Sequence, residues 1–431
     1  MQRVSTQPSD PAAGSLAAFL ERRGLLLAVG VGLVARLAMT SALFQWDAVP
    51  TSSDDETYAK FALGLLRTGH LESHHMPVGY PFYVALVLKL SGGSFAAVRA
   101  THVLFGVGTV ALVSKVAGVL YGRRAGLAAA WLTALYPPLV FMTGRVMSET
   151  LFIFLLMASL LQLLIGDRDA STGRTVAGGA LFAVASVVRS NLLVMLPFLP
   201  LWILARPGAA FPVKLRRAVL CGAVAGAIVL LPGLYFLLDR GEFIPSATNA
   251  GQTFYGANNQ YANGGWVHFE DHPDLIASIP PSVAQSAQAY SKAQFQLGLQ
   301  WIRREPGAFL RLLPKKLANA WVPGLQVSET TSGSKLALFV FNLSSGLLLL
   351  GAIGGRLLVR PARRDGILLA VPATYTLMSL AFYGNPRIGL FCSPVLIVYG
   401  ASIVARVLGP PEPAEGAKAP ITAPGSRSRA A

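Results

Sequence analysis

The sequence predicts an all-α, polytopic membrane protein with about ten transmembrane helices. Of its 431 residues, 53% are hydrophobic and only 13% are charged, whereas an ordinary soluble domain carries about 25% charged residues. A chain of this composition cannot build a water-soluble surface. Its apolar residues also fall into long runs separated by short basic segments, which is typical of membrane-spanning helices.

The apolar runs set the expected helices, because a membrane span needs about 20 predominantly apolar residues. The first run, Gly24–Phe44, follows Arg22–Arg23 as in a signal peptide, but it is long and many further runs follow it. We therefore interpret it as an uncleaved first helix. The predicted helices lie near 25–44, 98–120, 125–143, 149–165, 175–188, 191–205, 218–238, 336–358, 366–384 and 388–407.

The basic residues predict the orientation of these helices. The chain carries 36 Lys and Arg against 20 Asp and Glu, and in so hydrophobic a chain this excess indicates cytoplasmic loops rather than nucleic-acid binding. With both ends in the cytoplasm, every inner segment is basic, as the positive-inside rule requires. These segments are Arg22–Arg23, Arg123–Arg124, Arg168 to Arg174, Lys214 to Arg217, Arg356 to Arg364, and the chain from Arg406 onward.

Two segments then face the opposite side: a first outer loop, 45–97, and a large outer loop, 239–335, between helices seven and eight. Within the first, Val78–Leu90 is apolar but short, and counting it as a span would invert every later helix. We therefore expect it to lie in the membrane interface.

Three acids open the first outer loop, in the stretch Ser53-Asp54-Asp55-Glu56-Thr57-Tyr58. One interpretation is a helix N-terminus, where a cap and acidic residues in the first turn are favoured by the helix dipole. The other is a carboxylate, fixed at the membrane surface, that deprotonates an acceptor hydroxyl.

These residues resemble a known family. Asp55-Glu56-Thr57-Tyr58, followed by Pro77-Val78-Gly79-Tyr80-Pro81, is similar to the first outer loop of the GT-C superfamily of membrane glycosyltransferases. The resemblance is to the branch that holds protein O-mannosyltransferases, the lipid A aminoarabinose transferase and rhizobial galacturonosyltransferases. It continues in Tyr136-Pro137-Pro138, Ser148 to Phe152, Thr248 to Gly251, Tyr255 to Asn259, Gly264-Gly265-Trp266, Trp301 to Leu317 and Tyr383 to Arg387.

The resemblance implies transfer of a sugar, with inversion, from a polyprenyl phosphate. Phosphate leaves without a general acid, so the site needs a base for the acceptor hydroxyl and cations for the departing phosphate. The motif match makes Asp55 the expected base. Asp54 is the reserve, because two adjacent Asp residues leave the register open.

Further site residues are expected from the motifs and from buried arginines, and several of them have a plainer alternative. Glu149 matches an acid near the catalytic one, or it caps a helix together with Ser148. Arg387, Arg189 and Arg145 are expected to bind the donor phosphate, although Arg387 alternatively anchors the chain at the interface. Expected substrate-binding residues are Tyr58, His75, Asn249, Asn258 and Trp266, although Asn also serves turns.

A metal is not required by this chemistry. His74 and His75 with nearby Glu72 form a possible divalent-metal site, but adjacent histidines do not point the same way on a helix or strand. Cys221 and Cys392 lie in apolar runs without a metal-binding spacing, so they indicate neither a disulfide framework nor a zinc site. No cofactor is therefore expected.

The chain is expected to divide into five parts. They are a cytoplasmic N-terminus (1–23), an N-terminal transmembrane catalytic module (24–238), the large outer loop (239–335), the C-terminal transmembrane helices (336–407) and a cytoplasmic tail (408–431). The tail, rich in Pro, Ala, Gly and Ser, is expected to be disordered.

The predicted function is transfer of a sugar from a polyprenyl-phosphate donor to a hydroxyl of a lipid, polysaccharide or protein. The enzyme would lie in a bacterial inner membrane among membrane lipids, with its site on the periplasmic or exterior face, and would not bind nucleic acid. A flippase or transporter of lipid-linked sugars, or a non-catalytic subunit of an envelope-assembly complex, would share this topology, but neither needs a base.

Overall fold

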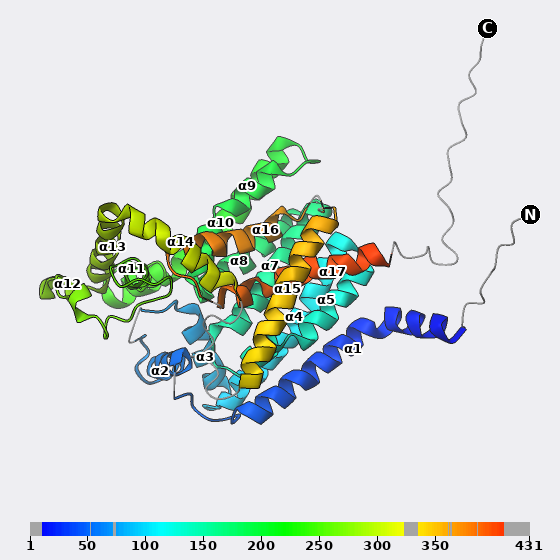
Figure 1. The fold of residues 1–431 in the computed structure, drawn as a ribbon, viewed down its shortest axis with the longest axis horizontal. Coiled ribbons are helices and arrows are strands. Elements are labelled where there is room, and N and C mark those ends of the chain that lie inside the picture. The colour runs from blue at the N-terminus through cyan, green and yellow to red at the C-terminus, as the bar shows by residue number, and fades with distance from the viewer. Residues whose placement is uncertain are drawn as a thin grey trace, which may run out of the picture.

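The computed structural model describes residues 11–51, 53–71, 75–322, 335–360, 362, 364–385 and 387–408. Within these ranges the regular elements are all helices (Figure 1), which confirms the predicted all-α fold. The helices up to the middle of the chain are α1 (Pro11–Leu43), α2 (Ser53–Thr68), α3 (Gly79–Leu90), α4 (Phe95–Tyr121), α5 (Arg123–Leu135), α6 (Pro137–Met142), α7 (Ser148–Arg168), α8 (Thr172–Val188), η1 (Ser190–Met195), α9 (Phe198–Ala205) and α10 (Phe211–Arg240). The later ones are α11 (Ala250–Ala257), η2 (Pro273–Leu275), α12 (Pro281–Ala284), α13 (Ala287–Arg304), α14 (Pro306–Trp321), α15 (Lys335–Leu358), α16 (Gly366–Ala381) and α17 (Arg387–Val407).

Six helices among the described residues are long and apolar enough to cross a membrane, which confirms an integral membrane protein. They comprise Arg23–Leu43 of α1, then α4, α7, α10, α15, and Gly389–Val407 of α17. Shorter apolar helices cover Gly79–Leu90, Thr172–Val188, Ser190–Ala205 and Gly366–Ala381. All ten predicted segments are therefore largely helical, although several are shorter than a full span.

The differences from the sequence prediction are clearest in two helices. α1 begins at Pro11, well before the predicted start near residue 25. The helix predicted over 125–143 breaks at Tyr136, which has extended backbone angles (φ −67°, ψ 110°) between α5 and α6. Pro137 explains the break, because proline lacks a backbone N–H and pushes the preceding residue out of the helical region.

The short helix α3 corresponds to the predicted interfacial segment. Its 12 residues rise only about 18 Å, too little to cross the hydrocarbon core of a bilayer. It contacts α2, α4 and α8. This length fits an interfacial position, which stays a prediction.

The large loop predicted over 239–335 is mostly helical where the structure describes it. Helices α11 to α14 gather at the left of Figure 1, and α14 contacts both α16 and α17. Asn258 fixes part of this arrangement: its amide nitrogen donates to the carbonyl oxygens of Phe254 and Ala381, at 2.8 and 3.0 Å. The predicted disordered tail from Pro410 lies outside the described residues.

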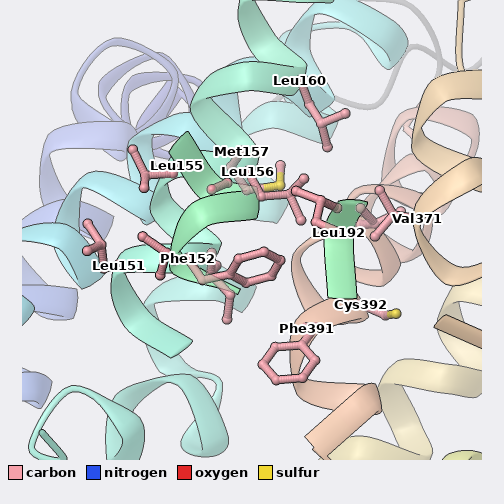
Figure 2. Close-up of a cluster of buried hydrophobic side chains, with 14 of the residues drawn as sticks. Leu151, Phe152, Leu155, Leu156, Met157, Leu160, Leu192, Val371, Phe391 and Cys392 are labelled. Atoms are coloured by element: carbon pink, nitrogen blue, oxygen red, sulfur yellow. The ribbon is translucent and has the colours of Figure 1, made fainter. Parts of the chain in front are cut away.

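α7 forms the centre of the bundle and is the most buried of the six long apolar helices. Figure 2 shows Phe152 and Leu156 on the side of α7 that faces Leu192 of η1, Val371 of α16 and Phe391 of α17, whereas Leu151 and Leu155 lie on its other side. The rings of Phe152 and Phe391 meet edge to face, with centroids 5.6 Å apart. This packing fixes the first turn of α7 relative to the chain around η1 and to the start of α17.

α15 lies at the periphery of the bundle. Only 6% of its apolar stretch is buried, and it contacts α17 and α6. The seam with α17 depends on Gly355, where a Cβ atom would clash with the carbonyl oxygen of Tyr399. The close approach of the two backbones thus requires glycine at this position.

Candidate functional site

Three carboxylates and three arginines, brought together from distant parts of the chain, form pairs beside the first turn of α7. Asp54 Oδ2 lies 2.5 Å from Arg387 Nη1, and Asp55 Oδ2 accepts a 2.7 Å hydrogen bond from Arg145 Nε. Glu149 Oε1 lies 3.2 Å from Arg189 Nη1. The predicted catalytic and phosphate-binding residues are therefore neighbours in pairs.

The first turn of α2 supplies two of these acids. α2 begins at Ser53, with Asp54, Asp55 and Glu56 in its first turn, so the helix N-terminus inferred from the sequence is present. Glu56 pairs locally with Lys60, at 2.7 Å. Asp54 and Asp55 instead meet arginines from α17 and from the chain before α7, and the catalytic interpretation of the acidic stretch stays a prediction.

Asp55 is buried and firmly held. Both carboxylate oxygens contact Arg145, and the backbone N–H of Val146 donates to Oδ2 at 3.2 Å. A carboxylate offers about four lone-pair positions, and these three donors leave one open on Oδ1. Asp55 is thus oriented by Arg145 and keeps one position to accept a proton.

Arg145 is itself positioned by a histidine that the sequence analysis missed. Nδ1 of His102 donates to the carbonyl oxygen of Arg145 at 2.9 Å, and Nε2 lies 3.1 Å from the hydroxyl of Tyr80. His102 is fully buried in α4. A polar residue inside an apolar span is the signal that would have pointed to it.

Glu149 and Arg189 form the most deeply buried pair. The side chain of Glu149 is fully buried and that of Arg189 is 17% exposed. Arg189 Nη1 also donates to Ser148 Oγ at 2.7 Å, and its guanidinium lies 4.4 Å from the centre of the Phe391 ring. Ser148 in turn lies 3.3 Å from the hydroxyl of Tyr58, which brings this predicted substrate-binding residue into the cluster.

Several buried polar atoms around this pair lack hydrogen bonds among the described residues. They are Arg189 Nε, the hydroxyl of Tyr375 and Glu149 Oε1, the last of which makes only its ion-pair contact. Buried polar atoms in native proteins are nearly always hydrogen-bonded. Unsatisfied groups beside a charged pair therefore mark a place where a polar ligand would complete the bonding.

Arg387 and Asp54 are the most accessible pair. Their side chains are 27% and 39% exposed. The backbone N–H of Arg387 donates to Asn385 Oδ1 at 2.9 Å, which fixes the first turn of α17. Pro386, expected to break the chain here, lies outside the described residues.

The other predicted substrate-binding residues divide into two groups. His75 interacts electrostatically with Asp54. Burial lowers the pKa of His75, and the negative charge of Asp54 partly offsets this shift. Asn249 and Trp266 make their contacts within the large loop, where the Asn249 carbonyl accepts from Thr253 and Trp266 packs beside His268. Their binding roles stay predictions.

Asn258 has a further internal partner. Its Oδ1 accepts a 2.7 Å hydrogen bond from Nζ of Lys316, a buried lysine that also donates to the carbonyl oxygen of Leu380. Burial lowers the pKa of Lys316 to about 8. The contacts of Asn258 join the large loop to α14 and α16, and its role in substrate binding also stays a prediction.

The possible metal site receives no support from the described ranges. His74 and Glu72 lie outside them, and the described residues contain no group of three His, Cys, Asp or Glu side chains that could hold a metal ion. The carboxylates of the cluster face arginines instead.

Comparison with known proteins identifies related sequences and folds. Residues 75–236 match the family described as dolichyl-phosphate-mannose-protein mannosyltransferase. No curated protein matches the chain. Among solved structures, the oligosaccharyltransferase AglB from Archaeoglobus fulgidus, in complex with an inhibitory peptide and a dolichol-phosphate, matches at a TM-score of 0.54 and 15% identity over 91% of this chain and 50% of that one.

Two further solved structures are similar to the chain. The apo form of the Archaeoglobus fulgidus enzyme matches at a TM-score of 0.56 and 15% identity, over 90% of this chain and 50% of that one. ArnT from Cupriavidus metallidurans, bound to undecaprenyl phosphate, gives a TM-score of 0.43 and 18% identity over 88% of this chain and 77% of that one.

The chain thus spans about half the length of the archaeal oligosaccharyltransferases and shares their fold over nearly all of its own length. The family match covers the region that contains Arg145, Glu149 and Arg189. The chain is thus similar over residues 75–236 to the mannosyltransferase family, and similar in fold to the archaeal oligosaccharyltransferases.

Proposed function

We propose that this protein transfers a sugar, with inversion, from a polyprenyl-phosphate donor to an acceptor hydroxyl on the extracytoplasmic face of a bacterial inner membrane. The observation that carries the proposal is the cluster of three carboxylate–arginine pairs beside the first turn of α7. The matched family is named for a dolichyl-phosphate donor, and the archaeal relative was solved with a dolichol-phosphate. Both support a lipid-phosphate donor.

The arginines suit the leaving group. A guanidinium holds phosphate oxygens through charge-assisted and often bidentate hydrogen bonds. Arg387 is partly exposed at the start of α17, and Arg189 has an unsatisfied Nε in the same cluster. These two arginines would bind the donor phosphate and stabilise its charge as the glycosidic bond breaks.

Arg145 has a different part in this proposal. Its guanidinium is occupied by Asp55, and its carbonyl oxygen is held by His102. We therefore assign Arg145 the task of orienting Asp55 rather than binding phosphate.

Asp55 is the proposed base. It lies at the matching motif position, its orientation is fixed, and one lone-pair position on Oδ1 stays open for the proton of the acceptor hydroxyl. Asp54 is more exposed and is engaged by Arg387. It remains the alternative base, and the two are separable by mutation.

The test uses a deletion strain complemented with wild-type protein or variants. Mass spectrometry of envelope glycolipids and glycoproteins should reveal a sugar that is lost in the deletion strain and in the Asp55→Asn strain. Asp274→Asn is the matched control, because Asp274 accepts hydrogen bonds from Gln260 and Tyr261 in the large loop, away from the cluster.

A flippase or an assembly subunit predicts a different result, since neither needs a carboxylate at position 55. Full modification in both Asp55→Asn and Asp54→Asn strains would refute the proposed chemistry. Once the sugar is known, single-turnover transfer by purified protein identifies the protein itself as the catalyst.

A further inference from the structure

A cavity lies at the end of α7 opposite the carboxylate–arginine cluster. α7 starts at Ser148 beside the cluster and ends at Arg168 beside the cavity, and its 21 residues rise about 30 Å, the thickness of the hydrocarbon core. The cavity therefore lies at the other membrane face. We call these two regions the site end and the basic end of the bundle.

The cavity of the basic end has a volume of about 200 Å³, far above the roughly 10–15 Å³ that a single water needs. It lies where the ends of α7, α8, α9, α10 and the chain before α16 converge. Its charged lining residues, within the described part of the chain, are Asp167, Arg168, Arg206, Lys214, Arg217 and Arg364.

The carboxylates here do not balance the cations. Asp167 Oδ2 is shared by Arg206 and Arg364, at 3.2 and 2.7 Å. Arg168 pairs with Asp169 at 2.7 Å. Among the described residues, five basic side chains line the cavity, against Asp167 in the lining and Asp169 and Asp365 beside it.

Lys214 and Arg217 carry the surplus charge. Within the described chain, Nζ of Lys214 donates to the carbonyl oxygen of Arg206, and the guanidinium of Arg217 donates to the carbonyl oxygen of Ala170. A carbonyl oxygen satisfies a donor without neutralising its charge. The basic end is therefore a cation-rich cavity in which Lys214 and Arg217 make no ion pair with a carboxylate of the described chain.

Two buried donors in the lining also lack partners among the described residues. They are the indole Nε1 of Trp202, a side chain only 6% exposed, and Nε of Arg217. Both residues line the cavity. Unsatisfied donors beside surplus positive charge favour an anion with several acceptor oxygens, and phosphate has this chemistry.

The surface next to the cavity is apolar. Leu201 and Phe211 are each 62% exposed, and Leu215 and Val219 of α10 are 43% and 58% exposed. In a membrane protein such side chains face acyl chains, so the cavity borders lipid at headgroup depth. A phospholipid can place its phosphate in the cavity and its tails against α9 and α10.

We propose that the basic end binds the phosphate of an anionic phospholipid from the adjacent leaflet. Basic pockets between transmembrane helices bind anionic headgroups through the same charge complementarity. The proposal is independent of the transfer reaction assigned to the site end.

The test measures binding to delipidated full-length protein in detergent by native mass spectrometry. The probes are phosphatidylglycerol, phosphatidylcholine with the same acyl chains, and inorganic phosphate. Arg217→Gln and Lys214→Gln remove charge from the cavity. Arg216→Gln is the matched control, because Arg216 is the exposed neighbour on the same helix and does not line the cavity.

Phosphatidylglycerol should bind wild type and Arg216→Gln alike, and about tenfold more weakly to either cavity variant, with phosphatidylcholine well below it. Equal phosphatidylglycerol affinity in wild type and both cavity variants would overturn the proposal. If inorganic phosphate binds as tightly as phosphatidylglycerol and loses affinity equally in the cavity variants, the cavity binds free phosphate and the proposal of a phospholipid ligand is wrong. If Arg217→Gln does not fold, Lys214→Gln decides the result.

Discussion

The two ends of α7 handle charge in opposite ways. At the site end, Asp54, Asp55 and Glu149 each face an arginine. At the basic end, five basic side chains of the described chain line the cavity, and three of them pair with a carboxylate, Asp167 or Asp169. The same helix therefore joins a region of balanced charge to a region of surplus positive charge.

This difference in charge balance changes how an anionic ligand would bind at each end. Unbalanced cations attract an anion over a distance of about a Debye length and lose this attraction in salt. Balanced pairs exert little long-range field, so a phosphate at the site end must enter the cluster and compete with carboxylates already present. Such a site can hold its arginines in place before the donor arrives.

The largest expected effect is on stability, from breaking the deepest pair. Glu149→Met leaves Arg189 buried without its carboxylate, which should lower the free energy of unfolding by roughly 3–5 kcal/mol. The exposed pair Arg168–Asp169 at the basic end is the comparison, and Asp169→Asn should cost far less, because exposed ion pairs add little to stability. Denaturant titration of both purified variants measures the difference.

The double variant Glu149→Met/Arg189→Met serves as the control for this prediction. Replacing both members of a buried ion pair by apolar residues is often nearly neutral, so the double variant should recover most of the loss. Equal costs for Glu149→Met and Asp169→Asn would mean that the two ends do not differ in this way.

The second prediction concerns turnover at the site end. Asp55→Asn keeps the size of the side chain but removes its basicity, so transfer should fall by at least about a hundredfold. Polyprenyl-phosphate binding should change little, because the arginines assigned to phosphate are Arg387 and Arg189. Single-turnover rates and a binding titration test the two halves separately, with Asp274→Asn as control.

A third prediction concerns Arg387. Arg387→Ala should weaken polyprenyl-phosphate binding by about tenfold, the loss of one charge-assisted contact, and Arg387→Lys should restore only part because an ammonium cannot bind two oxygens in a fork. If Arg387 only anchors the chain at the interface, lysine will substitute fully and donor affinity will not change.

Asp54→Asn tests whether the carboxylate of Asp54 competes with the donor phosphate for Arg387. Without its carboxylate, Arg387 is free to meet phosphate, so polyprenyl-phosphate affinity should rise a few-fold and become more sensitive to salt. This change would make the site end resemble the basic end. An unchanged affinity would show that Asp54 does not compete with the donor.

The last prediction concerns Lys316, a buried cation near the site end that is held by Asn258 and a carbonyl oxygen. Its pKa is lowered to about 8 in the folded protein, against about 10.4 in an unfolded chain. Between these values the unfolded state binds more protons, so this residue's contribution to stability rises with pH. Between pH 8 and 10, the melting temperature of wild type should rise relative to that of Lys316→Met. If the difference between the two melting temperatures does not change with pH, the pKa of Lys316 is not lowered in the folded protein.

The sequence was a good guide to the helices because the signal for a membrane span is carried by local composition. It failed where a single residue overrides composition, as at Tyr136 before Pro137. The start of α1 was also missed, because residues 11–22 continue a helix without being apolar enough to extend the predicted span.

The membership of the site was largely predictable, but its internal pairing was not. Motif resemblance selected Asp54, Asp55, Glu149, Arg145, Arg189 and Arg387, and the structure brings all six together. Which acid meets which arginine depends on packing between residues as far apart as 54 and 387. The support given to Arg145 by His102 depends on the contact between α4 and the chain before α7, which no local pattern indicates.

The peripheral position of α15, which packs mainly on α17, has a practical consequence for purification. Because most of α15 faces outward and Gly355 sets its approach to Tyr399, the bilayer itself acts as a large part of the packing around this helix. Extraction replaces that lateral support with a micelle, so α15 should be the first long helix to loosen. A detergent or nanodisc that preserves annular lipid is therefore the appropriate starting condition for each of the assays above.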